Sequence, residues 1–243
     1  IWVGTGDASC TRSAYPGNGI YKSVDGGANW QHMGLRDSQH IARIVVHPTN
    51  PNIVFPAVMG HLFSTNKERG VFKTTDGGVT WKKVLYTNEK TGAVDLVIDR
   101  SHPNTLYAAT YECMRRPWRL EDGGAASGIY KTTDGGATWK LVLKGDADTG
   151  ANDLVIAGSD PNIMYASMYQ RRRTQCCMNG GGPGSGVFKS TDAGETWTRV
   201  EGGLPTGPMG RIALDVFRTS ANIVYALVEG EGPGKQKGDL QVE

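Results

Sequence analysis

Short runs in which apolar and polar residues alternate recur along the whole chain and are separated by turn-forming residues. Runs of the form Gly-[Ile/Val]-[Tyr/Phe]-Lys occupy residues 19–22, 70–73, 128–131 and 186–189. A second set of short apolar runs occupies residues 42–46, 94–98, 152–156 and 211–215. Alternation over a few residues between turn signals is typical of β-strands. The pattern therefore predicts an all-β chain made of repeated units.

A Pro/Asn turn followed by another apolar strand completes each unit. These segments are residues 47–58, 101–110, 159–168 and 218–227. Each period then holds four strands, which is the content of one β-propeller blade. We expect a partial blade at 1–35, blades at 41–86, 93–143 and 151–200, a partial blade at 210–230 and a polar loop or tail at 231–243. Because propellers usually have more blades than this, we expect part of a larger ring of about seven blades.

The turn after each Gly-[Ile/Val]-[Tyr/Phe]-Lys strand has one frame, with an Asp, a Gly and a Trp at fixed positions. The Asp/Trp pairs are Asp25/Trp30, Asp76/Trp81, Asp134/Trp139 and Asp192/Trp197, and the Asp residues are 51, 58 and 58 residues apart. An Asp at a turn accepts backbone N–H groups, glycine permits positive φ, and Trp offers a large surface that can pack against a neighbouring blade. Residues that recur once per repeat serve the repeat, so we assign these residues to structure.

These turns match the bacterial neuraminidase repeat, or Asp box. Over residues 1–230 the chain resembles bacterial sortilin-like propellers, which are often labelled glycosyl hydrolases. Similar boxes occur in sialidases, xyloglucanase-type glycosidases and photosystem-assembly propellers. The resemblance implies a β-propeller of four-stranded antiparallel blades, but it leaves the activity open, because one fold hosts many functions.

Charge and composition exclude several classes of function. The chain has 26 basic and 24 acidic residues, so no strong field favours nucleic acid or a membrane surface. No apolar stretch approaches the ~18 residues of a membrane span, and no phosphate loop or dinucleotide motif predicts a cofactor. The sequence begins at Ile1 without a signal-peptide pattern, so we expect any targeting segment to have been removed or to lie outside this stretch.

The face opposite the boxes is the expected working face, since the innermost strands start there. Alignment of these strands places four charged residues at one equivalent position, namely Arg43, Asp95, Asp153 and Arg211. Two interpretations stay open. Asp95 and Asp153 form an acid and base pair for glycoside hydrolysis, or the four residues form salt bridges and backbone caps in the channel.

Long connections at 4–19, 59–70, 110–128 and 168–186 are expected on the same face. Two of them hold a basic and partly aromatic cluster, made of Arg115, Arg116, Trp118, Arg119, Arg171, Arg172 and Arg173. An exposed Trp beside arginines can stack on a sugar or clamp an anionic ligand. The alternative is that the arginines anchor the loops and Trp118 covers a blade edge.

All four cysteines also lie in these connections. Cys113 and Cys176 or Cys177 belong to corresponding loops of adjacent blades, so we expect a cross-blade disulfide, although free thiols stay open. The spacing of these cysteines, with Cys10 as the fourth, predicts no metal site. A disulfide would suit an extracellular or periplasmic location.

The favoured hypothesis is an extracytoplasmic binding or scaffold propeller. It would recognise a protein, peptide or glycan through the loop face, and it could be a subunit of a larger assembly. The alternative is a xyloglucanase-like or sialidase-like glycoside hydrolase in which Asp95 and Asp153 act as the acid and base. A third hypothesis is a purely structural subunit, whose Arg/Trp loops would be buried against another chain.

Overall fold

A computed structural model describes residues 1–11 and 13–230 of the chain, so the expected tail at 231–243 lies outside the described residues. The described residues form strands and one short 3₁₀ helix, with no α-helix among them. The strands are β1 (Trp2–Gly4), β2 (Ile20–Lys22), β3 (Gln31–His32), β4 (Ile41–Val46), β5 (Val54–Val58), β6 (Gly70–Lys73), β7 (Lys82–Leu85), β8 (Thr91–Ile98), β9 (Leu106–Arg116), β10 (Arg119–Asp122), β11 (Gly128–Thr132), β12 (Lys140–Lys144), β13 (Thr149–Ile156), β14 (Met164–Arg173), β15 (Met178–Asn179), β16 (Gly186–Ser190), β17 (Thr198–Arg199), β18 (Met209–Val216) and β19 (Val224–Gly230), and the 3₁₀ helix is η1 (Arg36–Ser38). The predicted all-β fold class is confirmed.

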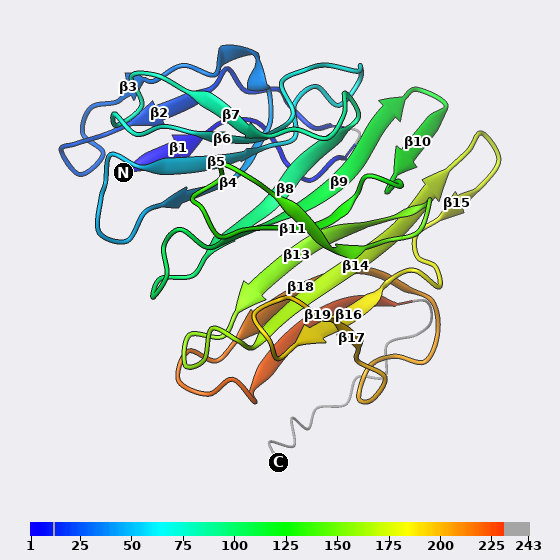
Figure 1. Ribbon diagram of the computed structural model, residues 1–243. Coiled ribbons are helices and arrows are strands. Elements are labelled where there is room, and N and C mark those ends of the chain that lie inside the picture. The colour runs from blue at the N-terminus through cyan, green and yellow to red at the C-terminus, as the bar shows by residue number, and fades with distance from the viewer. Residues whose placement is uncertain (12, 231–243) are drawn as a thin grey trace.

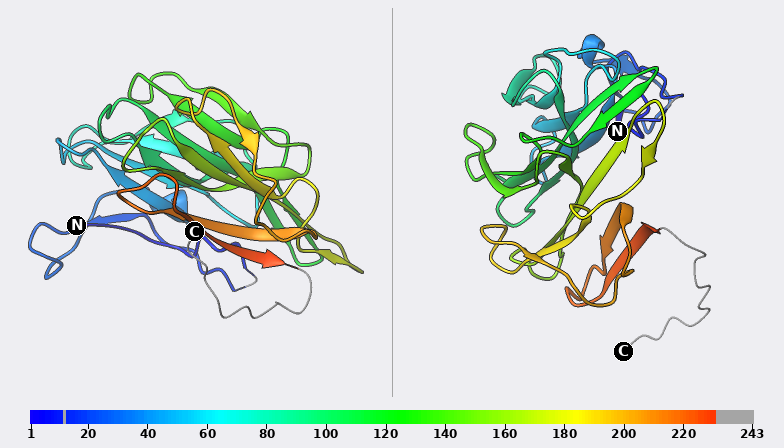
Figure 2. Two further views of the ribbon diagram at one scale, coloured as in Figure 1. Left: turned by 90° about the horizontal axis from the view of Figure 1, so that it is seen from below. Right: turned by 90° about the vertical axis from the view of Figure 1, so that its right-hand side faces the viewer.

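The strands form antiparallel sheets that follow one another from the N-terminal to the C-terminal end of the molecule (Figures 1 and 2). Strands β4 to β7 pair in chain order as one four-stranded blade. Strands β8, β9, β11 and β12 form the next blade, and β13, β14, β16 and β17 form the third. Strands β1 to β3 precede these blades, and the pair β18–β19 follows them. The chain is therefore a partial propeller.

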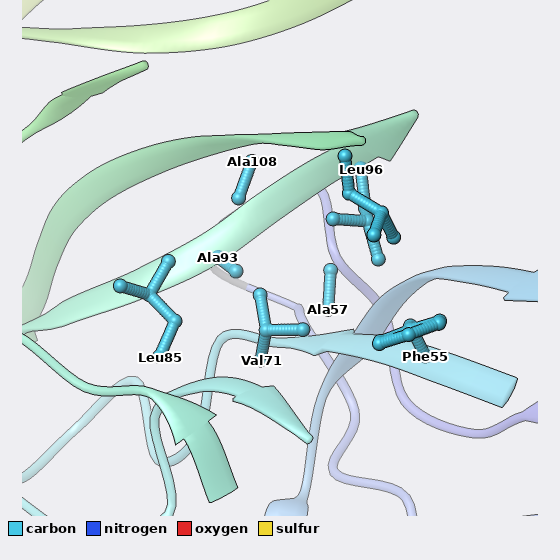
Figure 3. Close-up of a cluster of buried hydrophobic side chains, with 8 residues drawn as sticks. Phe55, Ala57, Val71, Leu85, Ala93, Leu96 and Ala108 are labelled. Carbon is cyan, nitrogen blue, oxygen red and sulfur yellow. The ribbon is translucent and has the colours of Figure 1, made fainter. Parts of the chain in front are cut away.

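Neighbouring blades pack face to face through their apolar side chains. Phe55, Val71 and Leu85 of one blade meet Leu96 and Ala108 of the next, and all five are buried (Figure 3). Similar clusters lie between the other neighbouring sheets. Because successive side chains of a strand point to opposite faces, each blade contributes to the cluster on either side.

The repeated turns form as their composition predicts. In the third one, the Gly136 amide donates to Thr132 Oγ1 over 3.0 Å, and the Thr138 amide donates to Asp134 Oδ1 over 2.9 Å. Gly135 and Gly136 have φ angles of 68° and 91°, which glycine adopts without steric cost. The Asp134 carboxylate therefore closes the turn through hydrogen bonds.

The box tryptophans are less buried than residues of the blade cores. Trp139 and Trp197 are half-buried, and each packs against the edge of the cluster between its own blade and the preceding one. Trp81 packs in the same way, and its indole N–H donates to the Met33 carbonyl over 2.6 Å. These three side chains lie at the box end of each cluster, so part of every ring stays in contact with solvent.

Trp30 is more exposed than the other three box tryptophans. Its side chain is 43% exposed, and it belongs to none of the buried clusters between described sheets. Trp30 belongs to β1–β3, and no sheet precedes these strands among the described residues. The expectation that each box Trp contacts a neighbouring blade is therefore confirmed for Trp81, Trp139 and Trp197, and it stays a prediction for Trp30.

Three of the four boxes are also tied to a neighbouring blade by a lysine. Lys22 Nζ donates to the Gly77 carbonyl, Lys73 Nζ to the Gly135 carbonyl and Lys131 Nζ to the Ala193 carbonyl, over 3.1, 2.8 and 2.8 Å. These lysines are the last or second-last residues of the strands that lead into the boxes of their own blades. The repeat therefore encodes a chain of contacts from one blade to the next.

Two of the expected long loops are largely strand. β9 continues to Arg116 and turns back as β10, and β14 continues to Arg173 and turns back as β15. β10 also pairs with β14, with Asp122 opposite Arg171, so two blades join into one ten-stranded sheet. The two hairpins project side by side in Figure 1. The expectation of irregular loops at 110–128 and 168–186 was wrong in this respect, because hydrogen bonding across blades orders these segments.

No helix among the described residues is long and apolar enough to cross a membrane.

Candidate functional site

A pocket of about 370 Å³ opens at the end of the blades opposite the Asp boxes. Thr132, which leads into a box, pairs with Leu106 at one end of β9, whereas Tyr111 pairs with Gly92 toward the other end. The residues that define the pocket's chemistry are Asp7, Tyr111, Asp122, Tyr169, Arg171 and Arg211. We call this site the Asp122 pocket. It receives side chains from the N-terminal loop, the extended hairpins and the start of β18.

Two stacked tyrosines form the apolar wall of the Asp122 pocket. The rings of Tyr111 and Tyr169 lie 6.1 Å apart with an interplanar angle of 16°. A Cβ atom at Gly150 would lie 2.5 Å from the Tyr111 ring, so glycine permits this packing. The Tyr111 hydroxyl is buried and has no hydrogen-bond partner among the described residues, and burial raises its pKa well above the usual value. The site therefore keeps one unused neutral donor.

Asp122 is a buried carboxyl group at the end of β10. Its side chain is 1% exposed, and one of its oxygens has no hydrogen-bond partner in the part of the chain that the structure describes. The Nε atom of Arg171 lies 3.6 Å from the other oxygen, which is too long for a hydrogen bond. Burial raises the pKa of Asp122 to about 7, although the nearby Arg171, Arg115, Arg172 and Arg211 oppose this shift. Burial therefore prevails, and Asp122 is protonated in mildly acidic solution.

Asp7 is a second carboxyl group in the Asp122 pocket, and its pKa shifts in the opposite direction. Hydrogen bonds from Ser9 lower the pKa of Asp7, and the positive charge of Arg211 acts in the same direction. The Ser9 amide donates to Asp7 Oδ1 over 2.8 Å. In mildly acidic solution one pocket therefore holds a protonated acid, Asp122, and an ionised carboxylate, Asp7.

Arg211 lies in the Asp122 pocket, and its alignment with Arg43, Asp95 and Asp153 was wrong. The ladders end with Val46 opposite Val54 in β4–β5 and with Val216 opposite Val224 in β18–β19. Arg43 lies three residues before Val46, and Ala213 lies three residues before Val216, so Arg43 corresponds to Ala213. Arg211 stands two residues earlier, nearer the start of its strand, where its side chain reaches the pocket.

Asp95 and Asp153 are brought together on the inner strands, outside the Asp122 pocket. Asp95 accepts hydrogen bonds from Arg43 Nε over 2.6 Å and from the amides of Leu96 and Leu154. Burial raises the pKa of Asp153 to about 6 against a hydrogen bond from the Leu214 amide, and contact with Asp95 also raises it. Each Asp accepts an amide of the next blade. Structural capping accounts for these contacts, and the catalytic role of the pair stays a prediction.

The arginine and tryptophan cluster is divided among three environments. Arg115 is buried and donates to the Cys10 carbonyl, and Arg172 pairs with Asp148. Arg171 belongs to the Asp122 pocket. Trp118, which is 56% exposed, lies at the hairpin tips in a groove of about 400 Å³ with Arg119, Thr174, Gln175 and Cys176. Arg116 is exposed near this tip, and Arg173 pairs with Leu120 along the β10–β14 ladder.

The disulfides differ from the predicted pairing. Cys113 is bonded to Cys10, and the adjacent Cys176 and Cys177 are bonded to each other. The N-terminal loop packs against β9, so Cys10 and Cys113 lie in one buried cluster, whereas Cys176 and Cys177 are exposed at the hairpin of the next blade. Ligand atoms of Cys10, Cys113 and Asp122 lie within 4.8 Å of one another. Because the two sulfurs are bonded together, only Asp122 of this group is available to a metal.

Sequence reasoning missed Asp7, Tyr111, Asp122 and Tyr169. None of these residues is part of a recognisable motif, and their proximity depends on the cross-blade pairing of β10 with β14. One available signal was that Tyr111 and Tyr169 follow corresponding strands at the same offset, in YAATY and YASMY. Paired aromatic residues at the working end of two blades indicate a lined pocket.

Comparison with known families agrees with this architecture. The Sortilin-Vps10 family model, described as "Sortilin, neurotensin receptor 3", matches residues 18–175. The chain belongs to the Sortilin-Vps10 family. The resemblance expected from the Asp boxes is thus confirmed.

Relatives of this Sortilin-Vps10 chain include xyloglucanases. It is 22% identical over 205 residues to xyloglucanase Xgh74A of Acetivibrio thermocellus, covering 76% of this chain and 23% of that protein. It is 28% identical over 163 residues to a xyloglucanase of Hypocrea jecorina, covering 54% of this chain and 17% of that protein. The chain therefore spans less than a quarter of the length of these curated relatives.

Solved structures of GH74 enzymes share the fold of the Sortilin-Vps10 chain. An ancestral GH74 enzyme aligns with a TM-score of 0.66 at 19% identity, over 94% of this chain and 27% of the other. The GH74 xyloglucanase from Xanthomonas campestris aligns with a TM-score of 0.62 at 17% identity, over 88% and 33%. At these identities the likeness establishes the propeller fold alone.

Proposed function

We propose that this chain is part of an extracellular propeller protein that binds a polysaccharide in the Asp122 pocket and hydrolyses its glycosidic bonds. Asp122 acts as the general acid and Asp7 as the general base. The observation that carries the proposal is that one pocket is lined by two carboxyl groups in different environments, Asp122 buried beside Arg171 and Asp7 hydrogen-bonded by Ser9. Burial raises the pKa of Asp122, and the hydrogen bonds lower that of Asp7. Two carboxyl groups whose environments separate their pKa values are the requirement of glycoside hydrolysis.

The proposed reaction uses groups already placed in the pocket. Protonated Asp122 donates its proton to the leaving glycosidic oxygen, while ionised Asp7 accepts a proton from the attacking water. The Tyr111 and Tyr169 rings form a wall against which a sugar ring packs. Similarity to xyloglucanases supports a polysaccharide substrate. That similarity and the Cys10–Cys113 disulfide support an extracellular location.

The test measures release of reducing ends from xyloglucan and from other plant and bacterial polysaccharides by the full chain. The variants Asp122→Asn and Asp7→Asn should each lower the rate at least about a hundredfold, which is the usual contribution of a positioned acid or base. Asp160→Asn, on the turn at the box end, is the matched control and should leave the rate unchanged. Activity that survives Asp122→Asn and disappears with Asp95→Asn or Asp153→Asn would move the reaction to the inner-strand pair.

A second candidate function is binding without hydrolysis. The buried Tyr111 hydroxyl and Arg171 Nε have no hydrogen-bond partners among the described residues, and a bound polar ligand would satisfy both. In this case the protein would bind a glycan but release no reducing ends. Capture of a protein or peptide in place of any glycan would favour the broader recognition role expected from the loop face.

A further inference from the structure

The Asp122 pocket contains two arginines whose hydrogen-bonding capacity is not used by the surrounding protein. Arg171 Nε is buried, and it makes no hydrogen bond within residues 1–11 and 13–230. The Arg211 guanidinium forms no ion pair or hydrogen bond in the same part of the chain, and its backbone amide alone donates, to Glu229. Unused guanidinium donors in a pocket require an acceptor when the pocket is filled.

The charges that line the pocket are unbalanced in favour of these arginines. Below pH 7 the Asp122 carboxyl is protonated and carries no charge, since burial raises its pKa to about 7. Asp7 is ionised and supplies one negative charge against Arg171 and Arg211. Among the residues that line the pocket an excess of one positive charge remains, while the Glu229 carboxylate, which accepts from the Arg211 amide, lies outside this lining. A concave site strengthens the attraction of such an excess for an anion.

Resting on the proposed function, we infer that the preferred substrate is an acidic polysaccharide whose sugars bear carboxylate groups. A carboxylate presents two oxygens to the planar guanidinium fork and can accept from both arginines. Its single charge matches the excess in the pocket. The Tyr111 hydroxyl offers a further donor, and the stacked Tyr111 and Tyr169 rings accommodate the sugar that carries the acid.

The test compares binding of polygalacturonate with binding of its fully methyl-esterified form and of neutral xyloglucan, by calorimetry at pH 6. Methyl esterification removes the charge and keeps the sugar chain. Arg211→Gln and Arg171→Gln should each weaken polygalacturonate binding about tenfold or more, the effect of losing one charge-assisted hydrogen bond. Arg218→Gln is the matched control, because this exposed arginine lies beyond the other end of β18. Thermal unfolding of each variant establishes that it is folded.

Preference for polygalacturonate of about tenfold or more, lost with Arg211→Gln and kept with Arg218→Gln, would support the inference. Equal binding of the charged and esterified chains would overturn it and leave a neutral-glycan hydrolase intact. Preference for a sulfated glycan over polygalacturonate would also overturn it. Failure to bind or cleave any polysaccharide, acidic or neutral, would instead refute the proposed function itself.

Discussion

The ionisation of Asp122 should be visible in the pH dependence of stability. Burial raises the pKa of this carboxyl to about 7, from 3.8 in the unfolded chain. Between these values the native state binds one more proton than the unfolded state, so stability must fall as pH rises. The difference of about 3 pKa units corresponds to about 4 kcal/mol when Asp122 is fully ionised in both states.

Asp122→Asn removes this titration and keeps the size of the side chain. Relative to the wild type, the free energy of unfolding of the variant should rise by about 3 kcal/mol between pH 5 and pH 8.5. Because the wild type and the variant are compared at two pH values, any pH-independent effect of the amide on the free energy of unfolding cancels. Asp7→Asn serves as the matched control: its pKa is lowered, so Asp7 is ionised in both states over this range and the difference should stay flat.

The assay is urea unfolding at half-unit pH intervals, followed by tryptophan fluorescence and far-ultraviolet circular dichroism. A difference between wild type and Asp122→Asn that does not change with pH would mean that Asp122 is ionised in the native state. Arg171, whose Nε lies 3.6 Å away, would then outweigh burial. The same result would remove the proposed general acid, so this measurement tests the mechanism without a substrate.

Three further outcomes test the fold and the pocket. The double variant Cys10→Ser/Cys113→Ser opens a disulfide that spans 103 residues, and it should lower the free energy of urea unfolding by about 4 kcal/mol, an effect that dithiothreitol should reproduce in the wild type. Lys131→Met should cost about 2 kcal/mol in the same assay because its buried ammonium group binds the next blade, whereas exposed Lys140→Met should cost less than about 1 kcal/mol. Tyr111→Phe removes an unpartnered hydroxyl, so calorimetry should show glycan binding weakened about fivefold while the melting temperature does not fall.

The propeller could be predicted because its information is repeated in the sequence. Each blade carries the same strand pattern and the same Asp turn, so four independent copies support one interpretation. The lysine contacts between blades follow the same period, although their partners, such as the Ala193 carbonyl for Lys131, are known only from the structure. Trp81 shows the limit of the repeat, because the motif specifies the ring, whereas its partner, the Met33 carbonyl, is known only from the structure. Repetition specifies the blade, and it says less about residues that occur once.

The pocket could not be predicted because it is assembled from departures from the repeat. The segment from Arg115 to Asp122 contains Pro117 and four charged residues besides Asp122, which is typical of a loop. In the structure these charges lie in a ladder, with Glu121 opposite Arg172 and Asp122 opposite Arg171. Opposite charges across a strand pair stabilise it, but their register cannot be read from one strand alone. The misplacement of Arg211 by two residues has the same origin in an unknown register.

The two ends of the blades therefore carry different kinds of information. At the box end, the contacts of Lys22, Lys73 and Lys131 are nearly equivalent, and each joins one blade to the next. At the opposite end, the disulfide from Cys10 and the hairpin that holds Asp122 occur once, and both border the same pocket. Such exceptions are tolerated only where they leave the hydrogen bonds of the repeat intact. The extended ends of β9 and β14 meet this condition, because they lie beyond the residues that pair with β11 and β16. The contacts that the blades share join one blade to the next, and the proposed selection of a substrate would depend on the residues in which the blades differ.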